Sequence, residues 1–487
     1  MDRRSRVDAL GISRTLAVSA ACVVAGCTLG PDYVRPAVEV PATFRFADSV
    51  RAQTSLADLA AWWREFGDPA LDALVDEGLV ANHDLRIATA RVDEFAAAVA
   101  ATHAQALPQL GYGANAGRQG GSGIAAGNYA ALLSASWELD LWGRIRREDE
   151  AARATLLASE EARLGVALTL VSAVISGYVT LLDLDRSLEI AQATLEGRRH
   201  NVDVFRTRFE GGAVSEFEMM QVTAEYETAA SAIPDLQRAI AQQEHALSAL
   251  VGRNPGSIAR GRTLEGLIAP PVPGGLPSDL VARRPDILQS EQLLVAANAR
   301  VGVARALYFP TLSLTATGGT ASRELDDLFS GPARSWSFAG QLLGPIFAGG
   351  AIDATNRQIE AQREQAIEAY RQSIQSAFRD VDDALISIGT RRVLIASLER
   401  QVVALRRAVD LARERYDNGY ADYLDVLDTE RSLFSSELAL SSARGDGYRS
   451  LVDLYRALGG GWIEQVAPLS ATAQSAPDVE TAAPSPR

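Results

Sequence analysis

The residue types that most often carry chemistry are few in this sequence, and their spacing does not assemble a catalytic site. The glycines from Gly111 to Gly123 are not followed by Lys-Ser or Lys-Thr, so they do not form a phosphate-binding loop. The adjacent carboxylates Asp382-Asp383 are typical of a solvated helix face. The histidines are scattered, without metal-ligand spacing or carboxylate partners: His83, His103, His200 and His245. We therefore expect no enzymatic activity, no cofactor and no metal site.

One cysteine thiol stands where it would be modified after export. Four arginines and an apolar stretch of about ten residues, Leu16–Ala25, predict a signal peptide over residues 1–26. The segment ends Val24-Ala25-Gly26-Cys27, which resembles a bacterial lipobox, in which the cysteine is lipidated and becomes the new N-terminus. Thr28 follows, and not the Asp that tends to retain lipoproteins in the inner membrane. The alternative is a buried cysteine near an ordinary cleavage site.

The composition excludes one large class of partners. The net charge is −14, and no lysine occurs. An acidic chain without a basic block argues against nucleic-acid binding. The second cysteine, Cys22, lies inside the signal peptide, so the mature chain has no intramolecular disulfide.

The elements that position any functional residues are predicted from a tandem repeat. At an offset of 202 residues identical residues recur, as in the pairs Asp84/Asp286, Ala97/Ala299, Val99/Val301, Ala104/Ala306, Pro108/Pro310 and Leu110/Leu312. At an offset of 207 residues, Arg208, Gly212 and Gly252 recur as Arg415, Gly419 and Gly459. Loop insertions produce such a change of offset. Each half is expected to contain a helix, two strands, a long helix, a tight turn and a return helix.

Four segments alternate between apolar and polar or small side chains, as strands with one apolar face do. They cover residues 110–116, 133–141, 312–317 and 335–342. The same alternation marks membrane β-barrels, although soluble sandwiches share it. We expect only these four strands, and four cannot close a barrel, since about eight is the practical minimum. Because an open edge is not tolerated in lipid, several chains would have to share one barrel.

The helices are predicted to be unusually long. Apolar residues recur every seven residues from Ile367 to Val409, and Arg391 is the exception among the companion positions three residues on. This heptad pattern predicts a left-handed coiled coil. The proline-free run from Gly350 to Tyr416 would reach roughly 100 Å at about 1.5 Å per residue.

One uncharged segment, Leu164–Leu182, is long enough for a transmembrane helix. Its polar residues lie three or four apart and form one stripe: Thr169, Ser172, Ser176 and Thr180. The stripe favours a packed helix with one wet edge over a helix that faces lipid.

Several motifs together resemble a known family. They are Cys27-Thr28-Leu29-Gly30-Pro31-Asp32-Tyr33-Val34-Arg35-Pro36, Trp62-Trp63 with Phe66, Arg284-Pro285-Asp286-Ile287 with Phe309-Pro310, Arg415-Tyr416 with Gly419 and Leu427-Asp428, and Leu458-Gly459-Gly460-Gly461-Trp462. In this order they cover about residues 27–462 and resemble the TolC-like outer membrane factors, in the lipoprotein branch called NodT-type.

The resemblance implies a mixed α and β membrane protein that works as a homotrimer. Four strands from each chain would form one twelve-stranded β-barrel in the outer membrane, and the coiled-coil helices would continue as a periplasmic α-barrel. Such a protein is the passive export duct of a tripartite pump, with a periplasmic adaptor and an inner-membrane RND transporter as partners. Lipid on Cys27, palmitate included, would anchor it in the outer membrane.

The resemblance also assigns roles near the two tight turns. Gly211-Gly212 and Asn418-Gly419 should lie at the periplasmic tip, where Gly and Asn permit a positive φ. By motif, the side chains that close the tip at rest are Tyr416, Leu424, Asp428 and Arg431. The last three share one helix face by their spacing. Without the resemblance, Asp428 and Arg431 would be an ordinary surface ion pair.

We expect the following domains: a signal peptide (1–26), a lipid-anchored segment (27–68), the first repeat (69–268), a linker (269–284), the second repeat (285–462) and a disordered tail (463–487).

Two other functions remain open. A duct of the same fold could serve protein secretion or metal export, which the identity of the partner transporter would decide. A lipid-anchored coiled-coil adaptor is the other, but an adaptor should have one helical hairpin, and two are expected here.

Overall fold

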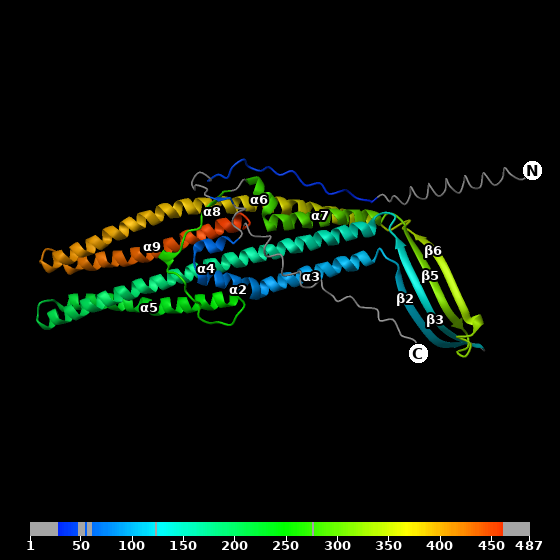
Figure 1. The fold of residues 1–487 in the computed structure, drawn as a ribbon, viewed down its shortest axis with the longest axis horizontal. Coiled ribbons are helices and arrows are strands. Elements are labelled where there is room, and N and C mark those ends of the chain that lie inside the picture. Colours follow the sequence, from blue (N-terminus) through cyan, green and yellow to red (C-terminus); the bar gives the residue numbers. More distant parts are fainter. Residues whose placement is uncertain (1–27, 47–53, 56–60, 122–123, 275–276, 461–487) are drawn as a thin grey trace, which may run out of the picture. The chain divides into compact units, whose positions relative to one another are not determined.

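A computed structural model describes residues 28–46, 54–55, 61–121, 124–274 and 277–460 (Figure 1). The predicted signal peptide, Cys27, the predicted C-terminal tail and part of the predicted linker lie outside this range. The described elements, in chain order, are β1 (Thr54–Ser55), η3 (Trp62–Phe66), α2 (Pro69–Ala81), α3 (His83–Ala104), β2 (Gln109–Gly121), β3 (Ile124–Leu139), α4 (Arg144–Glu210), α5 (Glu216–Leu250), η4 (Leu264–Gly266), β4 (Pro273–Gly274), α6 (Pro277–Arg283), α7 (Pro285–Ala306), β5 (Thr311–Ser322), η5 (Gly331–Ala333), β6 (Arg334–Leu343), α8 (Ala351–Asp417) and α9 (Tyr423–Ala457).

The predicted repeat is confirmed by the lengths of these elements. Helices α3 and α7 each have 22 residues, α4 and α8 each have 67, and α5 and α9 each have 35. Each half therefore runs helix, two strands, long helix, turn and return helix. Contacts between Cα atoms divide the chain into two compact units, and each unit contains parts of both halves.

The first unit, which includes residues 90–161 and 288–372, contains the main sheet. Its four antiparallel strands lie side by side in the order β2-β3-β5-β6 (Figure 1). The two hairpins are joined by the β3–β5 pair, in which Ala135 lies opposite Ala316. Within the described chain, β2 and β6 are edge strands with one neighbour each.

The register places the large apolar side chains on one face of this sheet. Leu110 lies opposite Ala135, Tyr112 opposite Leu133, and Phe338 opposite Ala316. The exposed apolar residues on this face are Leu110, Tyr112, Leu133, Trp137, Trp336, Phe338 and Leu342. This confirms the alternation predicted from the sequence. A folded chain that leaves so much apolar surface uncovered requires lipid or another protein against it.

The strand predictions need two corrections. Strand β3 ends at Leu139, and Leu141 lies beyond it in a turn in which its amide donates to the Leu139 carbonyl at 2.8 Å. In addition, the two-residue strands β1 and β4 form a small parallel pair that alternation could not predict, because two residues carry no period.

An extended segment after Thr28 is fixed to the helices of the first unit. The Arg147 guanidinium donates to the Leu29 carbonyl at 3.1 Å and to Asp32 at 2.8 Å. Farther along, the Tyr33 hydroxyl and the Arg35 guanidinium both donate to the buried carboxylate of Glu291 on α7. These contacts explain why the charged and aromatic residues of the opening motif occur at their spacing.

The second unit, which includes residues 162–287 and 373–460, contains the largest apolar core. The Trp62 ring stacks on the Tyr455 ring, with 4.5 Å between centroids. The buried Asp68 begins α2: its carboxylate accepts from the Ala70 amide at 2.8 Å and from the Tyr178 hydroxyl at 2.8 Å. The double-tryptophan motif is thus a core motif.

The uncharged segment of α4 lies in this core. Val171, Val174, Ile175 and Tyr178 are buried against its other members. Helix α4 is long and apolar enough to cross a membrane by composition, but more than half of its most apolar window is buried inside the protein. This agrees with the interpretation as a packed helix.

The heptad residues of α8 are buried as predicted, except that Ile395 is partly exposed. The buried ones are Ile367, Ile374, Val381, Ile388, Val402 and Val409. The exception, Arg391, pairs with Asp446 of α9 at 2.7 Å. Arg406 and Arg413 of α8 pair with Glu437 and Glu430 of α9, so α8 and α9 lie side by side as an antiparallel hairpin (Figure 1).

Candidate gate at the turns between the long helices

The two long helices end in the same type of turn. Gly212 has φ +71 and Gly419 has φ +76, and nothing lies within 4 Å of a Cβ built at either glycine. The amide of Ala213 donates to the Arg208 carbonyl, and that of Tyr420 donates to the Arg415 carbonyl, both at 2.8 Å. This is the bonding of a Schellman motif. Glycine is therefore required by its backbone angle and not by a lack of space.

The return helices begin differently. Helix α5 has a complete capping box: Ser215 caps the Glu218 amide, and the Glu218 carboxylate accepts from the Ser215 amide at 2.8 Å. Helix α9 begins after Asp422, whose side chain caps no amide. A missing cap costs about 1 kcal/mol at a helix end. The second turn is thus held less firmly than the first.

Tyr416 belongs to an aromatic cluster behind the second turn. Its ring lies 6.1 Å from the Phe205 ring and 5.0 Å from the Tyr423 ring. The Arg208 guanidinium lies over the Tyr416 ring and donates to its hydroxyl at 3.3 Å. Burial raises the pKa of the Tyr423 phenol. The cluster therefore joins the end of α4 to both sides of the second turn.

Arg431 is part of a charge cluster that connects the two hairpins. Its guanidinium nitrogen Nε donates to Oε1 of Glu225 on α5 at 2.7 Å, and a second nitrogen contacts the same oxygen. A third nitrogen lies 3.2 Å from the Asp428 carboxylate. Arg198 of α4 lies 3.2 Å from the other oxygen of Glu225. We call Arg198, Glu225, Asp428 and Arg431 the Glu225 cluster.

The members of the Glu225 cluster differ sharply in exposure. The Glu225 and Arg198 side chains are 9% and 6% exposed, whereas those of Arg431 and Asp428 are 51% and 65% exposed. The hydrogen bonds to Glu225 are the main reason that the pKa of Arg431 is raised, so this side chain remains a cation. A buried carboxylate between two guanidiniums is strongly coupled to both, because removing either leaves a poorly compensated charge.

The structure brings some of the expected gate residues together and separates others. Asp428 and Arg431 are in contact, and Tyr416 lies in the neighbouring aromatic cluster. Leu424 is exposed and is not among the buried residues of that cluster. The ends of the helices at both turns also leave apolar side chains in solvent: Phe209, Phe217, Met220 and Tyr420.

Sequence reasoning missed Arg198, Arg208 and Glu225. A signal for two of them was present. Glu225 and Arg431 are 206 residues apart, and Arg208 and Tyr416 are 208 apart, each within one residue of the repeat offset of 207. Nearly equivalent positions of the two hairpins therefore face each other. Arg198 has no such signal, because its partner depends on how the helices pack.

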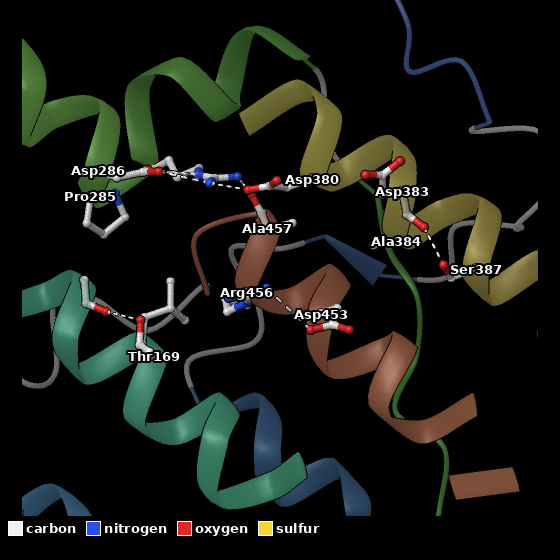
Figure 2. Close-up of a pocket in the computed structure, with 13 residues that line it drawn as sticks. Thr169, Pro285, Asp286, Asp380, Asp383, Ala384, Ser387, Asp453, Arg456 and Ala457 are labelled. Atoms are coloured by element: carbon white, nitrogen blue, oxygen red, sulfur yellow. Dashed lines mark hydrogen bonds and ion pairs between the residues drawn. The ribbon is translucent and has the colours of Figure 1, made fainter. Parts of the chain in front are cut away.

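The Arg-Pro-Asp motif lies at a different place in the second unit and holds three helices together (Figure 2). The Arg284 guanidinium donates to Asp286 of α7 at 2.8 Å, to Asp380 of α8 at 2.7 Å and to the Ala457 carbonyl of α9 at 3.0 Å. A cavity of about 370 Å³ lies beside it. The motif is thus structural, and Pro285 begins α7 where a missing amide costs nothing.

Comparisons with known proteins agree with this arrangement. The sequence matches the family described as "Outer membrane efflux protein" over residues 74–253 and 276–460. It is 36% identical to the antibiotic efflux pump outer membrane protein ArpC of Pseudomonas putida over 465 residues, which cover 93% of this chain and 96% of ArpC. It is 35% identical to the cation efflux system protein CusC of Escherichia coli K12, covering 91% and 98% of the two chains.

A solved structure is similar over the same range. The open state of the MtrE outer membrane channel of Neisseria gonorrhoeae matches with a TM-score of 0.82 and 34% identity. The match covers 90% of this chain and 99% of that structure.

Proposed function

The chain belongs to the outer membrane efflux protein family, and from this premise we propose that it is the passive exit duct of a tripartite efflux pump. It is an outer-membrane efflux channel. In the proposed pump it acts as a homotrimer, together with a periplasmic adaptor and an inner-membrane transporter of the RND type that supplies the energy.

The observation that carries the trimer is the open sheet. Strands β2 and β6 each lack a second neighbour in the described chain, and the sheet has an apolar face made of Tyr112, Leu133, Trp336 and Phe338. A sheet edge in lipid must be paired. Three copies of the four strands give twelve, which is enough to close a barrel.

The opposite face of the sheet suits a passive duct. The register brings small or uncharged polar side chains together there: Gln109, Asn115, Ser134, Ser136, Thr315, Thr317, Ser337 and Gln341. The charged residue Glu138 is compensated by Arg144 at 3.0 Å. A wall of this kind hydrates a channel without binding one cargo strongly.

The Glu225 cluster and the aromatic cluster support a gate at the tip, with Tyr416, Leu424, Asp428 and Arg431 as its moving side. Both clusters tie the second hairpin to the first. Opening the tip would require α8 and α9 to leave Glu225 and Phe205. The turns Gly211-Gly212 and Asn418-Gly419 are then the ends presented to the adaptor, with their exposed apolar residues as the contact surface.

Small organic molecules are the proposed cargo, and metal cations are the second candidate. The first rests on the likeness to ArpC, which is described as an antibiotic efflux protein, and the second on the likeness to CusC, described as a cation efflux protein. A deletion strain tests both in parallel. We expect ethidium to accumulate after deletion and to fall again when the chain is restored. Accumulation of transition-metal cations alone would favour the second candidate, and an unchanged level of ethidium and metal would contradict the proposal.

Lipidation of Cys27 is proposed to place the chain in the outer membrane, with the mature chain starting there. The fixing of Leu29 to Arg147 supports it, because a lipid two residues earlier would be held close to the sheet. Cys27→Ser should abolish incorporation of labelled palmitate, while channels still form because the barrel inserts by itself. Equal labelling of wild type and variant would contradict lipidation at this residue.

A further inference from the structure

A cavity of about 680 Å³ lies at the end of the sheet in the first unit, where α7 ends and α8 begins. The backbone of Leu29 and Gly30 forms one wall, and the rings of Tyr308 and Phe309 form another. Four charged side chains and one amide line the remainder: Arg305, Asp353, Asn356, Arg357 and Glu360.

The walls of the cavity are fixed. The Leu29 amide donates to the Trp142 carbonyl at 3.1 Å. Gly30 packs so closely against Gly302 that a Cβ added at Gly30 would lie 2.5 Å from the Gly302 Cα. The Asn356 amide donates to the Ala304 carbonyl at 3.0 Å and so joins α8 to α7. The backbone of Leu29 and Gly30 and the Asn356 side chain are therefore already in place before a ligand enters.

Its position is that of a membrane interface, on the proposal that the sheet spans the outer membrane. Strand β5 begins at Thr311, directly after the partly exposed pair Tyr308-Phe309. Ile346 and Phe347 are almost fully exposed just after β6. Aromatic and apolar side chains of this kind gather at the level of lipid headgroups.

Two positively and two negatively charged side chains line the cavity, and not all of them have a partner within the described chain. Arg305 pairs with Glu360 at 3.0 Å, and the Tyr308 hydroxyl donates to Asp353. Arg357 is exposed and forms no hydrogen bond or salt bridge with any residue that the structure describes. Two guanidiniums and two carboxylates around one cavity complement a ligand that carries both a negative and a positive charge.

We propose that this cavity binds the phosphoethanolamine headgroup of a membrane phospholipid. The phosphate binds Arg357, with Arg305 beside it, and the ammonium donates to the Glu360 and Asp353 carboxylates. The acyl chains then lie along the apolar face of the sheet, next to Leu342. One headgroup per chain would fill the junction between the sheet and the helices.

The test uses the full-length trimer in mild detergent and native mass spectrometry. The trimer is mixed with equal amounts of phosphatidylethanolamine, phosphatidylcholine and phosphatidylglycerol that carry the same acyl chains. We expect phosphatidylethanolamine to be retained preferentially, at one molecule per chain. Phosphatidylcholine has no N–H group to donate, and phosphatidylglycerol has no ammonium.

Variants test the residues proposed to bind the phosphate and those proposed to bind the ammonium separately. Arg357→Gln should weaken retention of phosphatidylethanolamine about tenfold, since charge-assisted hydrogen bonds to phosphate are lost. Arg400→Gln, an exposed arginine on the same helix, is the matched control and should change nothing. Glu360→Gln should remove the preference over phosphatidylglycerol, because it deletes an ammonium partner and releases Arg305.

Equal retention of the three lipids by the wild type would overturn the proposal, as would equal losses in the Arg357 and Arg400 variants. Arg357→Gln should leave single-channel conductance unchanged. Failure of the lipid site is therefore distinguishable from failure of the duct, which would appear as absent conductance in the wild type.

Discussion

At the residue scale, two arginines of similar chemistry have different roles. Arg284 is buried and bonded to α7, α8 and α9, whereas Arg431 is half exposed and bonded to one buried carboxylate on the other hairpin. The Arg-Pro-Asp motif could be found from sequence, but its contacts could not, because Asp380 and Ala457 are remote in the chain. Asp428 and Arg431 could be paired by their spacing, but spacing alone cannot assign Glu225 as the main partner of Arg431.

Arg284→Met should destabilise the protein by about 2–4 kcal/mol, because two carboxylates and a buried carbonyl lose their donor. Burial alone would raise the pKa of Asp380, but hydrogen bonds from Arg284 and Arg379 outweigh it and hold the pKa below its usual range. Stability from this carboxylate is present above about pH 4 and is lost as the pH falls through the lowered pKa. The measurement is the thermal midpoint of the trimer against pH. Arg400→Met, at an exposed arginine farther along α8, is the control, and an equal drop in both variants would contradict the assignment.

At the element scale, sequence periodicity predicted the helices and strands with a repeating side-chain pattern and missed the features that have no such pattern. The seven-residue pattern gave the buried face of α8, and the two-residue pattern gave the four long strands. The β1–β4 pair and the end of β3 at Leu139 were not predicted, because they depend on segments that meet only in the folded chain. The division into two compact units cuts across both repeats, which no local pattern encodes. The domain boundaries expected from sequence therefore remain a prediction.

Adjacent residues of β6 should face different surroundings in the assembled barrel. In a Cys27→Ser background, Ser337→Cys should react with a hydrophilic maleimide, because its face is the polar one. Phe338→Cys should react at least about tenfold more slowly, since neighbouring side chains on a strand point to opposite faces. The comparison is made on trimers in lipid vesicles. Equal reactivity of the two cysteines would show that this sheet does not separate lipid from water.

At the scale of the whole molecule, a single chain leaves its sheet open and uncovered. Among the residues that the structure describes, its four-stranded sheet has two free edges and an uncovered apolar face, and its helices are matched in length between the repeats. Purified protein in mild detergent should therefore run as a trimer in light scattering, because only other copies cover the edges. A stable folded monomer at the same protein concentration would refute the shared barrel.

Bilayer conductance tests most directly the claim that the chain forms a duct held closed at its tip. Wild-type trimers should be mostly closed. Glu225→Gln removes the charge that holds Arg431, so its open probability should rise at least about tenfold, which corresponds to roughly 1.4 kcal/mol. Asp428→Ala with Arg431→Ala should act in the same direction, whereas Glu227→Gln, an exposed carboxylate on the same helix, should resemble the wild type. Equal conductance of all four proteins, with trimers intact, would contradict the gate, and no conductance in any of them would contradict the duct.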